Sequence, residues 1–77
     1  MRTFDEMQDV FTARLRAAME KRSMTARDLA RALSLGRNTV YHWLSEGMVP
    51  NSYTLSQLCD VLGVSADWLL GREDNDE

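Results

Sequence analysis

The sequence predicts an all-α fold, a compact bundle of five helices in one small domain. Apolar residues recur at intervals of three and four residues, as on one face of a helix, and no segment alternates as a strand does. Residues that start and stop helices divide the chain into five such segments. The 77 residues are 44% hydrophobic, which is enough for one core in a chain of this length.

The first helix is expected over residues 4–22. Phe11 and Leu15 follow the helical spacing and give this segment one apolar face. Thr3 and Glu6 stand three residues apart at its start, which is the pattern of a capping box. The sequence therefore predicts both the length of this helix and the interaction that begins it.

Four shorter helices follow, each preceded by a residue suited to cap its N-terminus. They are expected over residues 26–33, 37–45, 52–62 and 66–70. Thr25, Asn51 and Ser65 are strong N-cap types. Gly36 is a weaker one. Gly63 stands where a left-handed residue commonly ends a helix.

The connection between the second and third helices is short. Only Ser34, Leu35 and Gly36 separate residues 26–33 from residues 37–45. Two short helices joined by three residues must cross steeply, which makes a helix-turn-helix that presents its second helix outward. A binding surface is therefore expected on residues 37–45.

Charge is unevenly distributed along the chain. The net charge is −3, but four of the twelve acids lie in the last five residues. Residues 14–37 contain seven bases and two acids, a local charge of +5. This pattern favours a basic surface, although a solvated helical surface accounts for it equally well. We expect residues 1–71 to form the domain and residues 72–77 to be an acidic disordered tail or the start of a linker.

Several classes of protein are disfavoured by what the sequence lacks. The longest apolar run is three residues and the first residues contain no apolar signal segment, so neither a membrane span nor secretion is expected. Cys59 and His42 are the single cysteine and histidine, which leaves no disulfide pair and no zinc cluster. No catalytic motif, phosphate loop, cofactor site or metal pattern is evident. We therefore expect a cytoplasmic protein that is not an enzyme and uses no cofactor.

Two segments carry a resemblance to a known family. The first, residues 24–43, has Leu29-Ala30 inside its first helix and Val40 in its second. The second, residues 62–71, reads Leu-Gly-Val-Ser-Ala-Asp-Trp-Leu-Leu-Gly. At this spacing the two segments resemble the phage repressor/Cro-type (Xre-like) helix-turn-helix family over nearly the whole chain.

The resemblance implies a lambda repressor-like DNA-binding domain and a sequence-specific transcriptional regulator that binds double-stranded DNA. It implies a phage-type repressor that acts as a homodimer on a two-fold operator, with residues 37–45 as the recognition helix. The family usually has Gly where this chain has Ser34, and often Gln where it has Ala26. The resemblance also suggests Trp68 and Leu69 as dimer contacts, with packing in the monomer core as an equal alternative.

The outward face of residues 37–45 carries side chains that fit the readout of base pairs. The candidates for base contacts are Arg37, Asn38, Tyr41 and His42. Arg37 can donate a bidentate pair of hydrogen bonds to guanine, and Asn38 can pair with adenine in the same manner. A polar outer face without a ligand is the plain alternative.

Contacts to phosphates need donors that flank this helix. The candidates are Thr25, Arg27, Arg31 and Thr39. Arg27 and Arg31 lie four residues apart on one helix face and can supply positive charge, although a solvated face explains them equally. The hydroxyl of Thr25 can contact a phosphate, and a role as a plain helix cap explains this residue equally well.

Two other functions fit the sequence. The chain could be an antitoxin or adaptor-like protein-binding module of the same fold, which its negative net charge and its non-basic loop after residue 45 favour slightly. It could also be the DNA-binding part of a longer repressor. A salt-dependent complex with DNA in the absence of any partner separates a DNA-binding protein from a protein-binding module.

Overall fold

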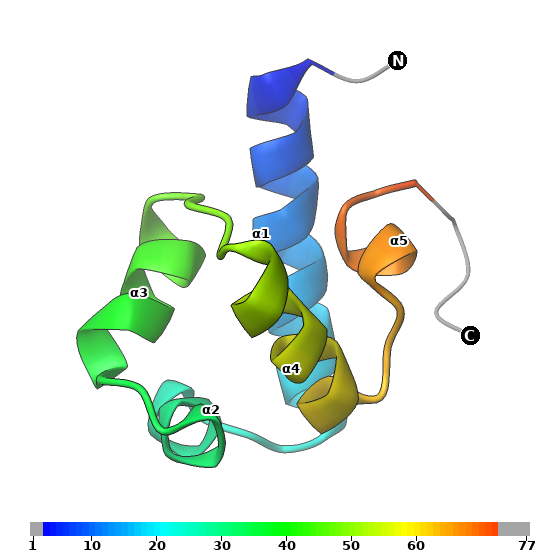
Figure 1. The fold of residues 1–77 in the computed structure, drawn as a ribbon. Helices are drawn as coiled ribbons and strands as arrows, with labels where there is room; N and C mark the ends of the chain where they lie inside the picture. Colours follow the sequence, from blue (N-terminus) through cyan, green and yellow to red (C-terminus); the bar gives the residue numbers. More distant parts are fainter. Residues whose placement is uncertain (1–2, 73–77) are drawn as a thin grey trace.

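The computed structural model describes residues 3–72 as an all-helical domain (Figure 1). Its helices are α1 (Phe4–Lys21), α2 (Ala26–Leu33), α3 (Arg37–Ser45), α4 (Ser52–Leu62) and α5 (Ala66–Leu69). No strand occurs within the described range. The predicted fold class and the number of helices are confirmed, and α1 and α5 each end one residue earlier than expected. Of the predicted tail, residues 73–77 lie outside the described residues.

The five helices surround one core. In Figure 1, α4 crosses in front of α1, with α2 and α3 on one side and α5 on the other. Helix α1 packs against α3 and α5, while α2 packs against α3 and α4. Every helix contributes to the core, whose fully buried large side chains are Phe11, Leu15, Leu29, Val40, Leu58 and Leu69. The outward helix α3 is thus held by α1 and α2 behind it.

The helix starts follow the capping chemistry that the sequence predicts. The backbone N–H of Glu6 donates to Thr3 Oγ1 at 3.2 Å, and the Thr3 N–H donates to Glu6 Oε1 at 2.9 Å. The side chain of Asn51 accepts from the third residue of α4, and that of Ser65 does the same for α5. Gly36 precedes α3 without any side-chain cap. These bonds satisfy backbone donors that a helix otherwise leaves open at its N-terminus.

Arginine side chains of α1 and of its C-cap residue, Arg22, bond to C-terminal carbonyls of three other helices. Arg16 donates to the carbonyl of Leu44 at 2.9 Å, at the end of α3. Arg14 reaches the carbonyl of Trp68 in α5, and Arg22 reaches that of Leu62 at the end of α4. A guanidinium at a helix C-terminus satisfies an open carbonyl and opposes the negative end of the helix dipole. Three of the seven bases counted in residues 14–37 therefore hold the fold together.

The turn between α2 and α3 depends on a left-handed residue that is not glycine. Ser34 has φ 58° and ends α2, while the N–H of Leu35 donates to the Ala30 carbonyl at 2.8 Å. An L-residue in this conformation carries a steric cost that glycine avoids. The departure from the family's usual Gly is accommodated without a change in the fold.

Replacement of Ser34 by glycine is expected to stabilise the protein. The relief of left-handed strain exceeds the entropy that glycine adds to the unfolded chain, for a net gain of about 0.5–1 kcal/mol. Urea unfolding followed by circular dichroism measures the change. Ser56→Gly is the matched control, because exposed Ser56 lies inside α4 and glycine should destabilise there. Equal destabilisation by both substitutions would contradict the assigned strain.

Candidate nucleic-acid interface

Helix α3 has one buried face and one exposed face. Val40 is fully buried, and Trp43 and Leu44 retain at most 8% of their surface. At 3.6 residues per turn these three side chains lie on one side of the helix. Arg37 and the other predicted base-contacting residues are all exposed. Asn38 and His42 therefore lie opposite the core, while Arg37 and Tyr41 are exposed beside that face.

The position of α3 is fixed by residues far from it in the sequence. Thr12 Oγ1 donates to the Trp43 carbonyl at 3.1 Å, one residue before the carbonyl of Leu44 that Arg16 holds. Both bonds come from α1 and end on the last turn of α3. Arg37 and Asn38 lie in the first turn of α3, at the opposite end of the helix from these two bonds.

The N-terminus of α3 lacks a side-chain cap. Gly36 occupies the N-cap position, and the N–H of Thr39 donates to the Gly36 carbonyl at 3.1 Å. Open amides and the positive end of the helix dipole favour an anion at such a terminus. Thr39 is exposed in this first turn, so its hydroxyl lies beside the same terminus.

The N-terminus of α2 is capped by its own side chains. The Asp28 N–H donates to Thr25 Oγ1 at 3.1 Å, and the Thr25 N–H donates to Asp28 Oδ2 at 3.0 Å. Hydrogen bonds to this carboxylate from the backbone and the side chain of Thr25, with weaker help from Arg31 and Arg27, hold the pKa of the Asp28 carboxyl below its ordinary value. The hydroxyl of Thr25 therefore acts as the helix cap.

The capping box makes stability depend on pH. A carboxyl whose pKa is lowered on folding stabilises the protein above its unfolded pKa, near about 4, and the contribution disappears as the pH falls through the folded pKa. Asp28→Asn should therefore lower stability at pH 7, with a difference from the native chain that shrinks below about pH 4. Thermal unfolding at several pH values measures it, with Asp9→Asn as an exposed control in α1. A difference independent of pH would contradict the assignment.

Arg27 and Arg31 are exposed on α2. Their charges help to lower the pKa of the Asp28 carboxyl, because both residues lie near the capping box. Arg22, which precedes α2, instead donates through Nε to the Leu62 carbonyl at 2.9 Å. The positive charge available beside α3 therefore comes from α2 and from Arg37.

One interaction on α3 was not predicted. His42 Nδ1 lies 3.1 Å from Glu46 Oε2, one helical turn further on. The separation of four residues on a helix is a signal that sequence reasoning could have used. Ser45, also exposed on the outer face of α3, was likewise overlooked. Glu46 thus adds a carboxylate to the edge of this face.

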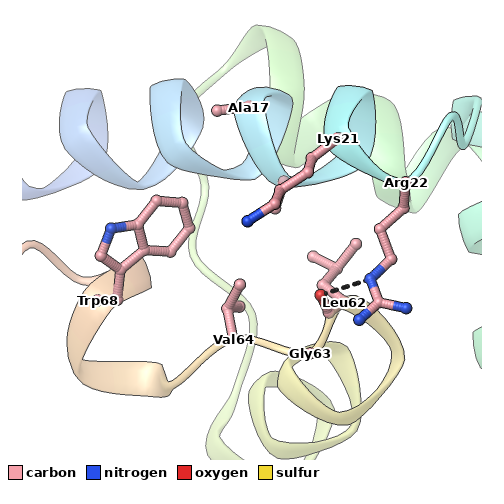
Figure 2. Close-up of a pocket in the computed structure, with 8 residues that line it drawn as sticks. Ala17, Lys21, Arg22, Leu62, Gly63, Val64 and Trp68 are labelled. Atoms are coloured by element: carbon pink, nitrogen blue, oxygen red, sulfur yellow. Dashed lines mark hydrogen bonds between the residues drawn. The ribbon is translucent and has the colours of Figure 1, made fainter. Parts of the chain in front are cut away.

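The two predicted dimer contacts occupy different environments. Leu69 has no exposed surface and packs in the core of the single chain, which was the alternative left open for it. Trp68 is half-buried and lines a groove of about 520 Å³ (Figure 2). The groove is bordered by Ala17, Ala18, Lys21, Arg22, Leu62, Gly63, Val64 and Trp68. The Arg14 guanidinium lies 5.1 Å from the centroid of the Trp68 ring, on a favourable cation–π approach.

Other chemistries find little support in residues 3–72. No group of three or more potential metal ligands occurs in this range. Within the same residues, no helix has the length and apolar character needed to cross a bilayer. Burial, and secondarily the charge of Asp60, raises the pKa of the Cys59 thiol, which makes the thiol less reactive.

Comparison with known proteins decides the family. A helix-turn-helix family model matches residues 15–69, which include the capped α2, the turn at Ser34 and the outward α3. The chain belongs to this helix-turn-helix family. The resemblance inferred from the sequence is thereby confirmed, and the family is one of DNA-binding domains without enzymatic activity.

A curated relative extends this comparison. The HTH-type transcriptional regulator ImmR of Bacillus subtilis (strain 168) is 31% identical over 61 residues. The match covers 79% of this chain and 48% of the relative, so the chain spans about half the length of that protein. No solved structure gave a significant match.

Proposed function

We propose that this helix-turn-helix domain binds double-stranded DNA in a sequence-specific manner and regulates transcription, as a phage-type repressor does. The observation that carries the proposal is the exposed surface of α3, which presents Arg37, Asn38, Tyr41 and His42 while Val40 and Trp43 are buried. An α-helix fits the major groove, where each base pair presents a distinct pattern of donors and acceptors. The name of the relative, a transcriptional regulator, supports the regulatory role.

Base readout would begin at the first turn of α3. Arg37 would donate two hydrogen bonds to O6 and N7 of guanine, and Asn38 would pair with N6 and N7 of adenine. Both side chains are exposed, and neither is used to cap a helix. Tyr41 and His42 follow one turn later and would contact the next base pairs or the adjoining backbone.

Backbone contacts would fix the register of α3 on the duplex. The open N-terminus of α3, with Thr39, supplies one phosphate site, and Thr25 supplies a hydroxyl at the start of α2. Arg27 and Arg31 add charge from the exposed side of α2. Such contacts position the protein and make its affinity depend on salt.

A homodimer on a two-fold operator would place two α3 helices one helical turn of DNA apart, about 34 Å. Trp68 remains the dimer candidate, because part of its ring lines a surface groove. Leu69 is not included, since the single chain buries it completely. Bound in this way, the dimer would act by occupying the operator and so blocking or recruiting polymerase.

Titration of a labelled duplex with the purified chain, between 50 and 200 mM salt, tests DNA binding without any partner. The logarithm of the binding constant should fall linearly with the logarithm of salt concentration. Arg27→Gln and Arg31→Gln should each reduce the slope by about 1. Arg72→Gln is the matched control, because Arg72 pairs with Asp67 beside α5. An absence of binding to any duplex would contradict the proposal.

A protein-binding module is the second candidate function. Met48 is 50% exposed in the loop after α3, and Tyr53 is 72% exposed at the start of α4. These apolar side chains, with the carboxylate of Glu46, occupy a segment where phosphate contacts would need cations. An antitoxin or adaptor-like protein would use them to hold a partner protein, and it would fail the salt-dependent DNA titration.

A further inference from the structure

The pair formed by His42 and Glu46 connects the readout face of α3 to its C-terminal end. His42 Nδ1 lies 3.1 Å from Glu46 Oε2, and both side chains are about half exposed, at 51% and 57%. The backbone reinforces this pairing, because the Glu46 N–H donates to the His42 carbonyl at 3.0 Å. The carboxylate therefore stands directly behind an imidazole that the proposed function directs at DNA.

The helix dipole does not favour a carboxylate at this place. Glu46 is the C-cap residue of α3. A negative charge there faces the negative end of the helix dipole, which favours cations. The neighbouring carbonyls of Trp43 and Leu44 already accept from Thr12 and Arg16 of α1. The Glu46 side chain makes a favourable contact with the imidazole of His42.

A carboxylate accepts hydrogen bonds and donates none, so the imidazole nitrogen that faces it must carry the proton. The neutral imidazole of His42 then has its proton on Nδ1 and its lone pair on Nε2, the nitrogen remote from Glu46. We propose that Glu46 is a positioning residue that fixes this tautomer, so that His42 reads a base edge as a hydrogen-bond acceptor. The inference rests on the proposed function, because it assigns a reading role within the same interface.

The fixed tautomer makes a definite prediction about the base. An acceptor on Nε2 pairs with an amino group in the major groove, which is N4 of cytosine or N6 of adenine. Guanine and thymine present acceptors at the corresponding edge and are disfavoured on the contacted strand. Glutamine at position 46 can donate as well as accept, so Glu46→Gln releases the constraint while preserving the shape of the side chain.

The tautomer can be measured on the protein without DNA. At pH 8 the ¹⁵N chemical shifts of the His42 imidazole should report a proton on Nδ1 in the native chain. In Glu46→Gln the shifts should move toward a mixture of both tautomers. Asp60→Asn, which removes one exposed carboxylate from α4, is the charge-matched control and should leave the shifts unchanged. A native imidazole protonated on Nε2 would overturn the inference.

The reading role is measured by selection of binding sites from random duplexes at pH 8. The native chain and Asp60→Asn should prefer cytosine or adenine at one position by about fivefold or more, the range of a good base contact. That preference should fall to about twofold or less in Glu46→Gln and in His42→Ala. Equal preference in the native chain and Glu46→Gln overturns the inference but leaves DNA binding intact. Selection of no site by the native chain overturns the proposed function, and the reading role with it.

Discussion

Replacement of Arg37 and Asn38 together by alanine is expected to remove most of the chain's preference for its operator. Each side chain can form a bidentate pair with one base, and each pair contributes about 1–3 kcal/mol of discrimination. Both residues are exposed on the first turn of α3 and outside the core. The variant should therefore fold normally while its affinity for the operator falls toward that for any duplex.

Competition between the selected operator and a scrambled duplex of equal length measures this loss. Arg37→Ala alone should relax the preference for guanine, and Asn38→Ala alone should relax a separate position. Arg72→Ala removes an arginine of comparable exposure beside α5 and should leave the ratio unchanged. An unaltered ratio in the double variant would show that α3 does not read the bases.

The replacement of Phe11 by alanine should have the largest effect on stability. Phe11 lies on α1 and has no exposed surface, so its removal leaves a cavity between α1 and the helices that it supports. Such substitutions cost about 3–5 kcal/mol, which equals the stability that a core of this size commonly supplies. The variant should be largely unfolded at 25 °C and should lose DNA binding as a consequence.

Circular dichroism and urea unfolding measure the effect against a matched substitution on the same helix. Phe4 is 67% exposed at the start of α1, so Phe4→Ala should change stability by no more than about 0.5 kcal/mol. A folded Phe11→Ala variant of near-native stability would contradict the placement of the core.

Local chemistry made most of the fold predictable. The capping box of Thr3 and Glu6 and the left-handed Gly63 depend on residues within one turn of each other, and sequence spacing reports such contacts directly. The exposed face of α3 was equally predictable, because helical periodicity separates Asn38 and His42 from the buried Val40. Those features needed no knowledge of how the helices pack.

The bonds between distant segments could not be predicted. Arg16 and Arg22 meet carbonyls 28 and 40 residues away, so no local pattern distinguishes them from solvated bases. The charge count therefore overstated the basic surface around α3. Leu69 shows the same limit, because an apolar residue suits a monomer core and a dimer interface equally until its neighbours are known.

Selection of binding sites from random duplex DNA by the purified chain, at moderate salt, is the most direct test of base readout by α3. We expect enrichment of one two-fold symmetric sequence, with preferences that Arg37→Ala and Asn38→Ala relax at separate positions. Enrichment of no sequence, by a chain shown to be folded, would contradict base readout by α3 and would favour a protein partner for this domain.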